Sequence, residues 1–196
     1  TEIHPQALAF IRTLADRLEA GAAFFLDYGF PEREYWHAQR HMGTLMCHKG
    51  HLADGDPLAD VGEKDITAHV DFTGIAVAAQ ESGLNVLGYT SQAHFLFNCG
   101  ILDLADGAPP RDHAAMQKLV NEHEMGELFK VIGLARGGFW EALGFARGDR
   151  TDRLVGVGEI IIGEFGDGIL ERPRQRRHGE GCSQEDGEQN RAKTVK

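Results

Sequence analysis

The sequence predicts an α/β fold in which helices alternate with short apolar strands. The first observation is the stretch Gly21–Phe30, GAAFFLDYGF, whose residues 22–26 are continuously apolar. Such a run suits a strand covered on both faces, as in a parallel sheet flanked by helices. The second observation is an amphipathic helix expected over residues 4–20, which Gly21 ends directly before this strand. Helix followed by strand is the second half of a crossover unit, so earlier strands of a parallel sheet are expected before Thr1.

Downstream of the first strand, the alternation of apolar strands and helices repeats. Residues 30–40 are polar and aromatic and predict a long loop or a short helix, and residues 51–62 are rich in Asp, Gly and Pro and predict a loop. Beyond Gly137, only residues 159–162 offer another short apolar run. Strands are expected at 43–48, 84–89 and 128–134, and helices at about 72–83, 93–99 and 111–124.

Composition and charge narrow the function classes. The 196 residues carry a formal net charge of -10, which disfavours nucleic acid as the main partner, because phosphate binding needs a concentrated basic surface. Three widely spaced cysteines do not indicate a disulfide framework. No apolar run reaches the length of a membrane span. We therefore expect no membrane partner and a cytoplasmic protein, with a small molecule or a protein as its partner.

The first candidate site is the triplet Asp27-Tyr28-Gly29, at the carboxyl end of the first strand. Ligands of open α/β sheets bind beyond the carboxyl ends of the strands, so an acid and a phenol at this point are placed for function. The alternative is an ordinary turn that Asp27 starts and in which Gly29 takes a positive φ.

The second candidate site contains Asp65, Thr67, His69 and Asp71. On an extended segment these alternate residues share one face, and an Asp beside a His can raise the basicity of the imidazole, as in a general base. The alternative is a helix cap made by Thr67 or Asp71.

A histidine-rich stretch raises a third possibility, a metal site. His37 and His41 are four residues apart, and His48 and His51 follow them, together with Cys47. Zinc binds such ligands, but the spacing fits no closed zinc pattern, so our expectation is that no metal is bound. The same stretch is better interpreted as a polar and aromatic rim that binds an organic partner.

Several motifs in order resemble one known family. They are FFLDYGFPEREYWHAQRHMGTLMCHKGH, DPLADVGEKDITAHVDFTGIAVAAQESGL, GYTSQAHFLFNCGI, MGELFKVIGLARG and LGFARGDRTDRL. Residues 1–154 resemble the carboxyl-terminal half of the MidA family of S-adenosylmethionine-dependent methyltransferases, which includes a mitochondrial complex I assembly factor. The resemblance implies the carboxyl-terminal part of a Rossmann-like class I methyltransferase sheet with an additional substrate-facing region.

The resemblance also implies S-adenosylmethionine as cofactor and a protein side chain, arginine, as methyl acceptor. The family's glycine-rich cofactor loop belongs upstream of Thr1, so the cofactor-binding residues are not expected in this chain, and the chain alone is expected to be inactive. A mitochondrial location is expected if the parent protein is eukaryotic. Residues 155–196 go beyond the matching region and are expected to form an extension, disordered from about residue 171, where charged residues dominate.

Methyl transfer requires the acceptor to be oriented, and carboxylates and aromatic faces can hold a guanidinium group. The residues predicted to orient the acceptor are Asp27, Tyr28, Asp65, His69, Asp71 and Gln92. Two alternatives stay open. One is a non-catalytic docking or assembly module that grips a partner through residues 93–99 and 30–41. The other is a metal-dependent enzyme that uses His37, His41, His48 and His51.

Overall fold

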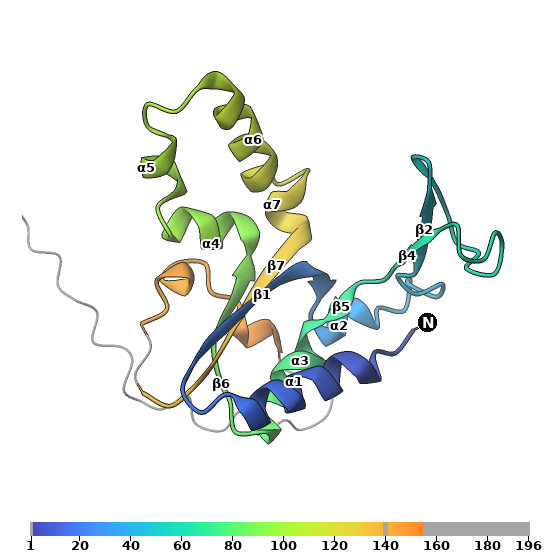
Figure 1. Cartoon of the computed structure of the whole chain (residues 1–196), viewed down its shortest axis with the longest axis horizontal. Helices are drawn as coiled ribbons and strands as arrows, with labels where there is room; N and C mark the ends of the chain where they lie inside the picture. The colour runs from blue at the N-terminus through green and yellow to red at the C-terminus, as the bar shows by residue number, and fades with distance from the viewer. Residues whose placement is uncertain (1, 139–140, 155–196) are drawn as a thin grey trace, which may run out of the picture. The chain divides into compact units, whose positions relative to one another are not determined.

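A computed structural model describes residues 2–138 and 141–154 of the chain, and these residues form a mixed α/β fold (Figure 1). The main sheet has four strands in the order β5-β1-β7-β6. Their bounds are Gly21–Phe30 for β1, Val70–Asp71 for β5, Asn85–Ser91 for β6 and Phe129–Arg136 for β7. The predicted strands at 22–26, 84–89 and 128–134 are therefore confirmed, each with slightly different ends.

The expectation of a parallel neighbour for β1 is wrong along most of the strand. β1 pairs antiparallel with β7 over eight residue pairs, from Gly21↔Arg136 to Tyr28↔Phe129, and parallel with β5 over only two. β6 is also antiparallel to β7. The apolar run in β1 indicates burial, which does not depend on the direction of the neighbouring strand, so the sequence pattern could not reveal β7 as the partner.

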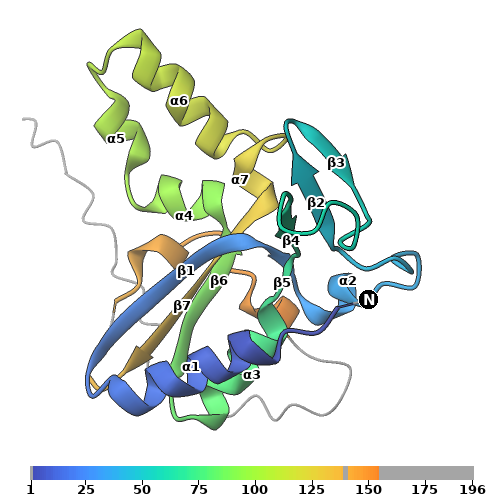
Figure 2. The same cartoon turned by 45° about the vertical axis from the view of Figure 1, so that its right-hand side comes forward.

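Helices α1 (Pro5–Arg17) and α3 (Phe72–Glu81) cover one face of the main sheet, as Figures 1 and 2 both show. Pro5 occupies the first turn of α1, and the helix ends at Arg17, three residues earlier than expected. The core lies between these helices and the sheet, where Ile11, Phe72, Tyr89, Ile132 and Leu134 are almost fully buried. This packing fixes the sheet that carries the candidate site.

The opposite face of the sheet is covered less completely. Phe145, from the 3-10 helix η1 (Leu143–Phe145), packs over Gly88 and Gly133, where an added Cβ would lie 2.3 and 2.8 Å from its ring. Phe24 and Leu26 of β1 also belong to this face by strand alternation, and they stay 44% and 47% exposed. The end of this face near β1 is thus apolar and open among the described residues.

Gly29 explains how β5 can approach the end of β1. A Cβ at Gly29 would lie 2.2 Å from the carbonyl oxygen of Val70, so no larger residue fits without backbone movement. Gly29 does not take a positive φ, so the turn alternative for this glycine is wrong. Its role is close approach between two backbones.

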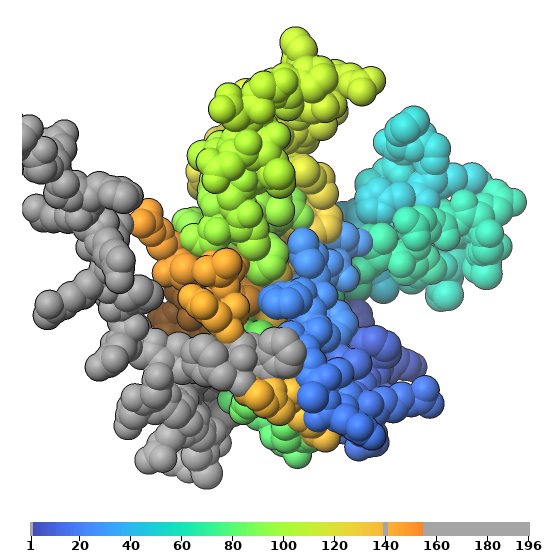
Figure 3. Space-filling view, turned by 60° about the vertical axis from the view of Figure 1, so that its left-hand side comes forward, coloured from blue at the N-terminus to red at the C-terminus, as the bar shows by residue number. Residues whose placement is uncertain are grey.

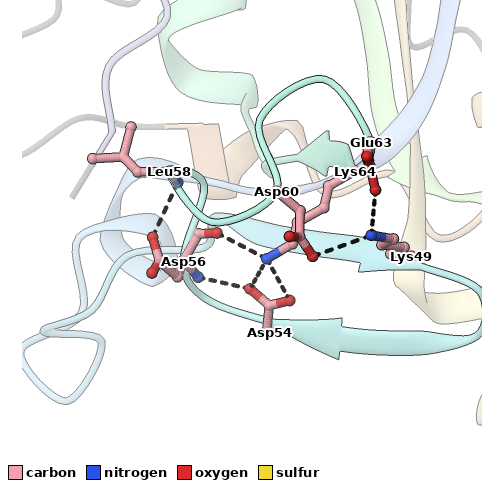
Figure 4. Close-up of polar contacts among 7 residues, drawn as sticks. All are labelled: Lys49, Asp54, Asp56, Leu58, Asp60, Glu63 and Lys64. Atoms are coloured by element: carbon pink, nitrogen blue, oxygen red, sulfur yellow. Dashed lines mark hydrogen bonds and ion pairs between the residues drawn. The ribbon is translucent and has the colours of Figure 1, made fainter.

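A second, three-stranded sheet has the order β3-β2-β4, with β2 at Met46–Lys49, β3 at Leu52–Asp54 and β4 at Asp65–Thr67. β3 falls in the segment 51–62, which was expected to be a loop throughout. Two lysines form ion pairs with the acidic residues in and next to that segment (Figure 4). Lys64 Nζ lies 2.8 Å from Asp54 Oδ2 and 3.1 Å from the Asp56 carbonyl oxygen. Lys49 pairs with Asp60 and Glu63. Ammonium groups therefore face the acidic side chains of this loop.

Short helices occupy much of the remaining described chain. The predicted helices at 93–99 and 111–124 are confirmed with shifted ends, and the loop after β1 contains one helical turn. The bounds are Glu32–Tyr35 for α2, Gln92–Asn98 for α4, Ile101–Ala105 for α5, Pro110–Val120 for α6, Met125–Leu128 for α7 and Thr151–Leu154 for the 3-10 helix η2.

Two predictions lie outside the described residues: the apolar run at 159–162 and the disordered extension from about residue 171. Within the described residues, no helix is both long enough and apolar enough to cross a membrane.

Candidate functional site

The carboxyl end of β1 carries Asp27 and Tyr28 on opposite faces of the main sheet, because adjacent strand residues alternate. Asp27 lies in one row with Lys130 of β7 and Ser91 of β6. Its Oδ1 atom accepts a hydrogen bond from the Tyr28 backbone N–H at 2.8 Å, and the side chain is exposed. Tyr28 turns to the face that carries Phe24 and Leu26.

Tyr28 belongs to a group of four rings and one guanidinium that we call the His69 cluster: Tyr28, Phe30, Arg40, His69 and Phe129. The His69 ring stacks on Phe30 at 4.9 Å and 13°, and meets Tyr28 edge to face at 5.1 Å. Phe129 contacts the other side of Tyr28 at 5.5 Å. Arg40 places its guanidinium 4.2 Å from the centre of the Phe30 ring. The cluster thus joins the carboxyl end of β1 and the start of β7 to the segment between β4 and β5.

The His69 imidazole has an unusual environment. Its Nδ1 atom is buried without a hydrogen-bond partner, and Nε2 makes no hydrogen bond either within the described residues. Burial lowers the pKa of His69, and the nearby Arg40 lowers it further, against smaller opposing effects of Thr44, Glu2 and Asp27. A lowered pKa favours the neutral form of the ring, which can accept a proton.

The backbone of His69 is tied to the N-terminal arm of the chain through Thr44. The His69 N–H donates to Thr44 Oγ1 at 2.9 Å, and the same hydroxyl donates to Glu2 Oε1. Glu2 Oε1 also accepts from the Thr44 N–H at 2.7 Å and from the Tyr35 hydroxyl at 3.2 Å. Neither Glu2 nor Thr44 was predicted as a site residue, because an isolated Glu and Thr carry no local signal in the sequence.

The four alternate residues of the second predicted site do not share one strand face. Asp65 lies in β4 of the three-stranded sheet, opposite His48, whereas Asp71 ends β5 of the main sheet. The chain leaves the extended pairing at residues 68 and 69, between the two sheets. The pattern could not reveal this break, since alternation was assumed to continue from 65 to 71.

Asp71 and Gln92 have structural partners. Asp71 Oδ1 accepts from the N–H groups of Thr73 and Gly74, both at 3.1 Å, so the predicted helix cap at Asp71 is confirmed. Burial raises the pKa of Asp71. Gln92 is buried and donates to the Leu119 carbonyl oxygen at 2.8 Å, which ties α4 to α6. The acceptor-orienting role predicted for both residues stays a prediction.

His37, His41, His48 and His51 are all exposed. Among the residues that the structure describes, no group of three or more His, Cys, Asp or Glu side chains could hold a metal ion. The metal-dependent alternative therefore gains no support from the geometry.

Lys130 is a buried cation at the same sheet edge that sequence reasoning missed. It lies between Asp27 and Ser91 in the strand register and is 3.5 Å from Glu127 Oε1. Glu127 also forms a two-bonded ion pair with Arg150, at 2.5 and 3.0 Å. Burial lowers the pKa of Lys130 despite Glu127, which raises it. This network ties Arg150 to α7 and to the start of β7.

Three junctions where a strand of the main sheet passes directly into an α-helix lie within the described residues. At these junctions, residues 30–32, 71–72 and 91–92, no glycine lies between the last strand residue and the first residue of the α-helix, whereas Gly137 and Gly138 follow β7. The His69 cluster offers instead aromatic faces and a neutral nitrogen, with a carboxylate nearby, a set that suits a nitrogen-bearing acceptor.

Comparison with known proteins finds a family model that matches the first part of the chain. Residues 1–90 match a family model described as "Putative S-adenosyl-L-methionine-dependent methyltransferase". No curated protein matches the chain.

Two solved structures from Burkholderia thailandensis are 52% identical to this chain and cover 76% of it. One, with a TM-score of 0.72, is described as a "likely methyl transferase" bound to S-adenosyl-homocysteine. The other, with a TM-score of 0.73, is described as an uncharacterized protein of the same superfamily. The chain spans only 41% and 42% of these two structures, about two fifths of their length.

The expected cofactor, S-adenosylmethionine, agrees with the family description and with the ligand of the relative. The expected α/β class agrees with the observed mixed fold. The first 90 residues of the chain thus match a family of S-adenosylmethionine-dependent methyltransferases, and three quarters of the chain share the fold of a relative that binds S-adenosyl-homocysteine.

Proposed function

We propose that the complete protein is an S-adenosylmethionine-dependent methyltransferase of Rossmann-like class I fold, and that the His69 cluster forms the acceptor side of its active site. The observation that carries this proposal is the His69 imidazole, which lies between aromatic rings at the carboxyl end of β1 and finds no hydrogen-bond partner for either ring nitrogen among residues 2–138 and 141–154. Nδ1 is buried, so Nε2 is the ring nitrogen that a ligand could contact.

The proposed acceptor is a nitrogen-bearing protein side chain, arginine by resemblance. Tyr28 and Phe129 offer ring faces and edges to a planar cation, and Asp27 adds a carboxylate at the same strand end. S-adenosylmethionine would supply an electrophilic methyl group. His69 would accept the proton that the acceptor nitrogen loses. Loss of that proton leaves the lone pair of the nitrogen free to attack the methyl group.

Three other predicted residues would support the acceptor site without contributing to the His69 cluster: Asp65, Asp71 and Gln92. Asp71 caps α3 directly after β5, and Gln92 fixes the start of α4, so both hold the sheet edge on which the acceptor would lie. Asp65 is exposed on β4 and is free to contact a protein substrate. In Figure 3 the blue surface of β1 lies between the yellow-green helices α4–α6 and the three-stranded sheet, where such a substrate could reach it.

The test is methyl transfer from S-adenosylmethionine with a tritiated methyl group. The complete protein is incubated with this cofactor and a desalted extract of its source cells, and the labelled products are hydrolysed and separated. The proposal predicts label in the protein fraction, recovered as methylarginine. Label recovered only in small molecules would refute a protein acceptor, and the absence of transfer from protein that binds the cofactor would refute the activity.

A second candidate, the non-catalytic docking module, is favoured by one observation. No residue of α5 or α6 is buried, and Leu102 and Leu104 are 58% and 80% exposed. Exposed apolar side chains on such a projection fit a protein partner. Calorimetry of the complete protein with S-adenosylmethionine separates the two functions, since a docking module without enzymatic activity has no need to bind this cofactor.

A further inference from the structure

Within the part of the chain that the structure describes, the His69 ring is held in place without a hydrogen bond to either ring nitrogen. Catalytic histidines are ordinarily oriented by a partner on the second nitrogen. Here the ring depends on stacking with Phe30, on its edge-to-face contact with Tyr28 and on the position of its own backbone. The backbone anchor is the bond from the His69 N–H to Thr44 Oγ1. Whatever fixes Thr44 therefore also fixes the imidazole.

Glu2 fixes Thr44. A single hydroxyl carries both bonds, because Thr44 Oγ1 donates its hydrogen to Glu2 Oε1 and accepts the N–H of His69 through a lone pair. The Thr44 N–H and the Tyr35 hydroxyl also donate to the same carboxylate oxygen. Thr44 is only 8% exposed and Tyr35 only 3%, whereas Glu2 is partly exposed, so its carboxylate accepts charge-assisted hydrogen bonds from two buried residues.

We infer that Glu2 is a positioning residue for His69 and acts through the Thr44 hydroxyl. Glu2 lies in the arm directly before α1, whereas Thr44 and His69 come from segments 42 and 67 residues further along the chain. The relay thus links the start of α1 to the proposed acceptor site. This inference rests on the proposed function only for its effect on methyl transfer; the physical link between Glu2 and the His69 ring is testable without any reaction.

Four substitutions in the complete protein test the relay. Glu2→Gln keeps the size of the side chain but removes its charge, and Thr44→Val keeps the shape but removes the hydroxyl. Thr44→Ser retains the hydroxyl and is the matched control for Thr44→Val. Glu81→Gln is the control for loss of a carboxylate, because Glu81 forms an exposed ion pair with Arg12 away from the cluster.

The first measurement is NMR of the histidine ring signals in protein with labelled histidine. The stacking of His69 on Phe30 gives its ring signals a distinct ring-current shift. We expect Glu2→Gln and Thr44→Val to move or broaden these signals, and Thr44→Ser and Glu81→Gln to leave them in place. The double variant Glu2→Gln with Thr44→Val should change the signals no more than Thr44→Val alone, since both residues act on one path.

The second measurement is the rate of methyl transfer at saturating S-adenosylmethionine. Glu2→Gln and Thr44→Val are expected to lower the rate about tenfold without changing cofactor affinity, and Thr44→Ser to restore it to within about twofold, since small displacements of a catalytic group are costly. Unchanged His69 signals in folded Glu2→Gln and Thr44→Val proteins would overturn the inference. Moved signals with unchanged transfer would overturn the positioning role. A wild-type protein that transfers no methyl group, but whose His69 signals respond as expected, would refute the proposed function and leave the relay standing.

Discussion

At the scale of single residues, the environment of His69 makes the pH dependence of methyl transfer predictable. Burial and Arg40 lower the pKa of His69, so the imidazole stays neutral to a lower pH than in free histidine. We expect kcat/KM to fall only when the pH drops below about 6.5, the ordinary pKa of histidine. Arg40→Gln removes one of the causes of the lowered pKa, so its acid limb should move to higher pH. An acid limb that stays where it is in Arg40→Gln would contradict this assignment.

Glu2 predicts a pH dependence of stability with a defined sign. Burial raises its pKa, but the hydrogen bonds from Thr44 and Tyr35 outweigh burial and hold the pKa below the ordinary value of 4.5. A carboxylate with a depressed pKa contributes stability above its unfolded pKa and loses it as the pH falls through the folded value. Urea unfolding should show a larger difference in free energy between wild type and Glu2→Gln at pH 7 than at pH 3. An equal difference at both pH values would contradict the charge-assisted bonds.

Gly29 offers a purely structural prediction. Gly29→Ala places a methyl group against the Val70 carbonyl oxygen, so the pairing of β1 with β5 must give way. Overpacking of this kind costs about 1–3 kcal/mol. Gly55→Ala is the matched control, because nothing lies within 4 Å of an added Cβ there. Thermal unfolding of both variants measures the difference, and equal melting temperatures would show that β5 does not approach β1 as closely as described.

At the scale of elements, the outer edge of β1 is the most informative feature. Within residues 2–138 and 141–154, this edge pairs only at Gly29 and Phe30, with β5, although the strand begins at Gly21. An open apolar edge is a template for another strand. Helices α1 and α3 lie on the same face of the sheet. The chain runs from β5, on the outer side of β1, through α3 to β6, at the opposite edge of the sheet. Because crossovers are almost always right-handed, we predict that in the complete protein a strand before α1 pairs with the outer side of β1.

Hydrogen exchange tests this placement. In the complete protein, the alternate amides of residues 21–28 that point away from β7 should be protected, and in the 196-residue chain alone they should exchange freely. The chain alone should also self-associate in ultracentrifugation, and Leu26→Lys, which puts a charge on the exposed apolar face beside this edge, should reduce that association. Equal protection of these amides in both proteins would contradict the account.

At the scale of the whole molecule, the sequence predicts the order of most helices and strands but not their pairing. Apolar runs located β1, β6 and β7, because burial leaves a local signature in composition. The antiparallel direction of β7 and the break between β4 and β5 depend on contacts between distant segments, which no local pattern contains. For the same reason the sequence indicated Tyr28 and His69 separately, whereas Thr44 and Glu2 were found only from their hydrogen bonds.

The central claim is that the His69 cluster acts on the methyl acceptor, not on the cofactor. The most direct measurement compares His69→Ala with His48→Ala, an exposed histidine of β2 outside the cluster, in the complete protein. Calorimetry gives the affinity for S-adenosylmethionine, and tritium transfer gives the rate. We expect the affinity for S-adenosylmethionine to be unchanged in both variants. The rate of methyl transfer should be at least about a hundredfold lower in His69→Ala alone, which is the size of a general base contribution. A folded His69→Ala protein that transfers methyl groups at the wild-type rate would contradict the claim.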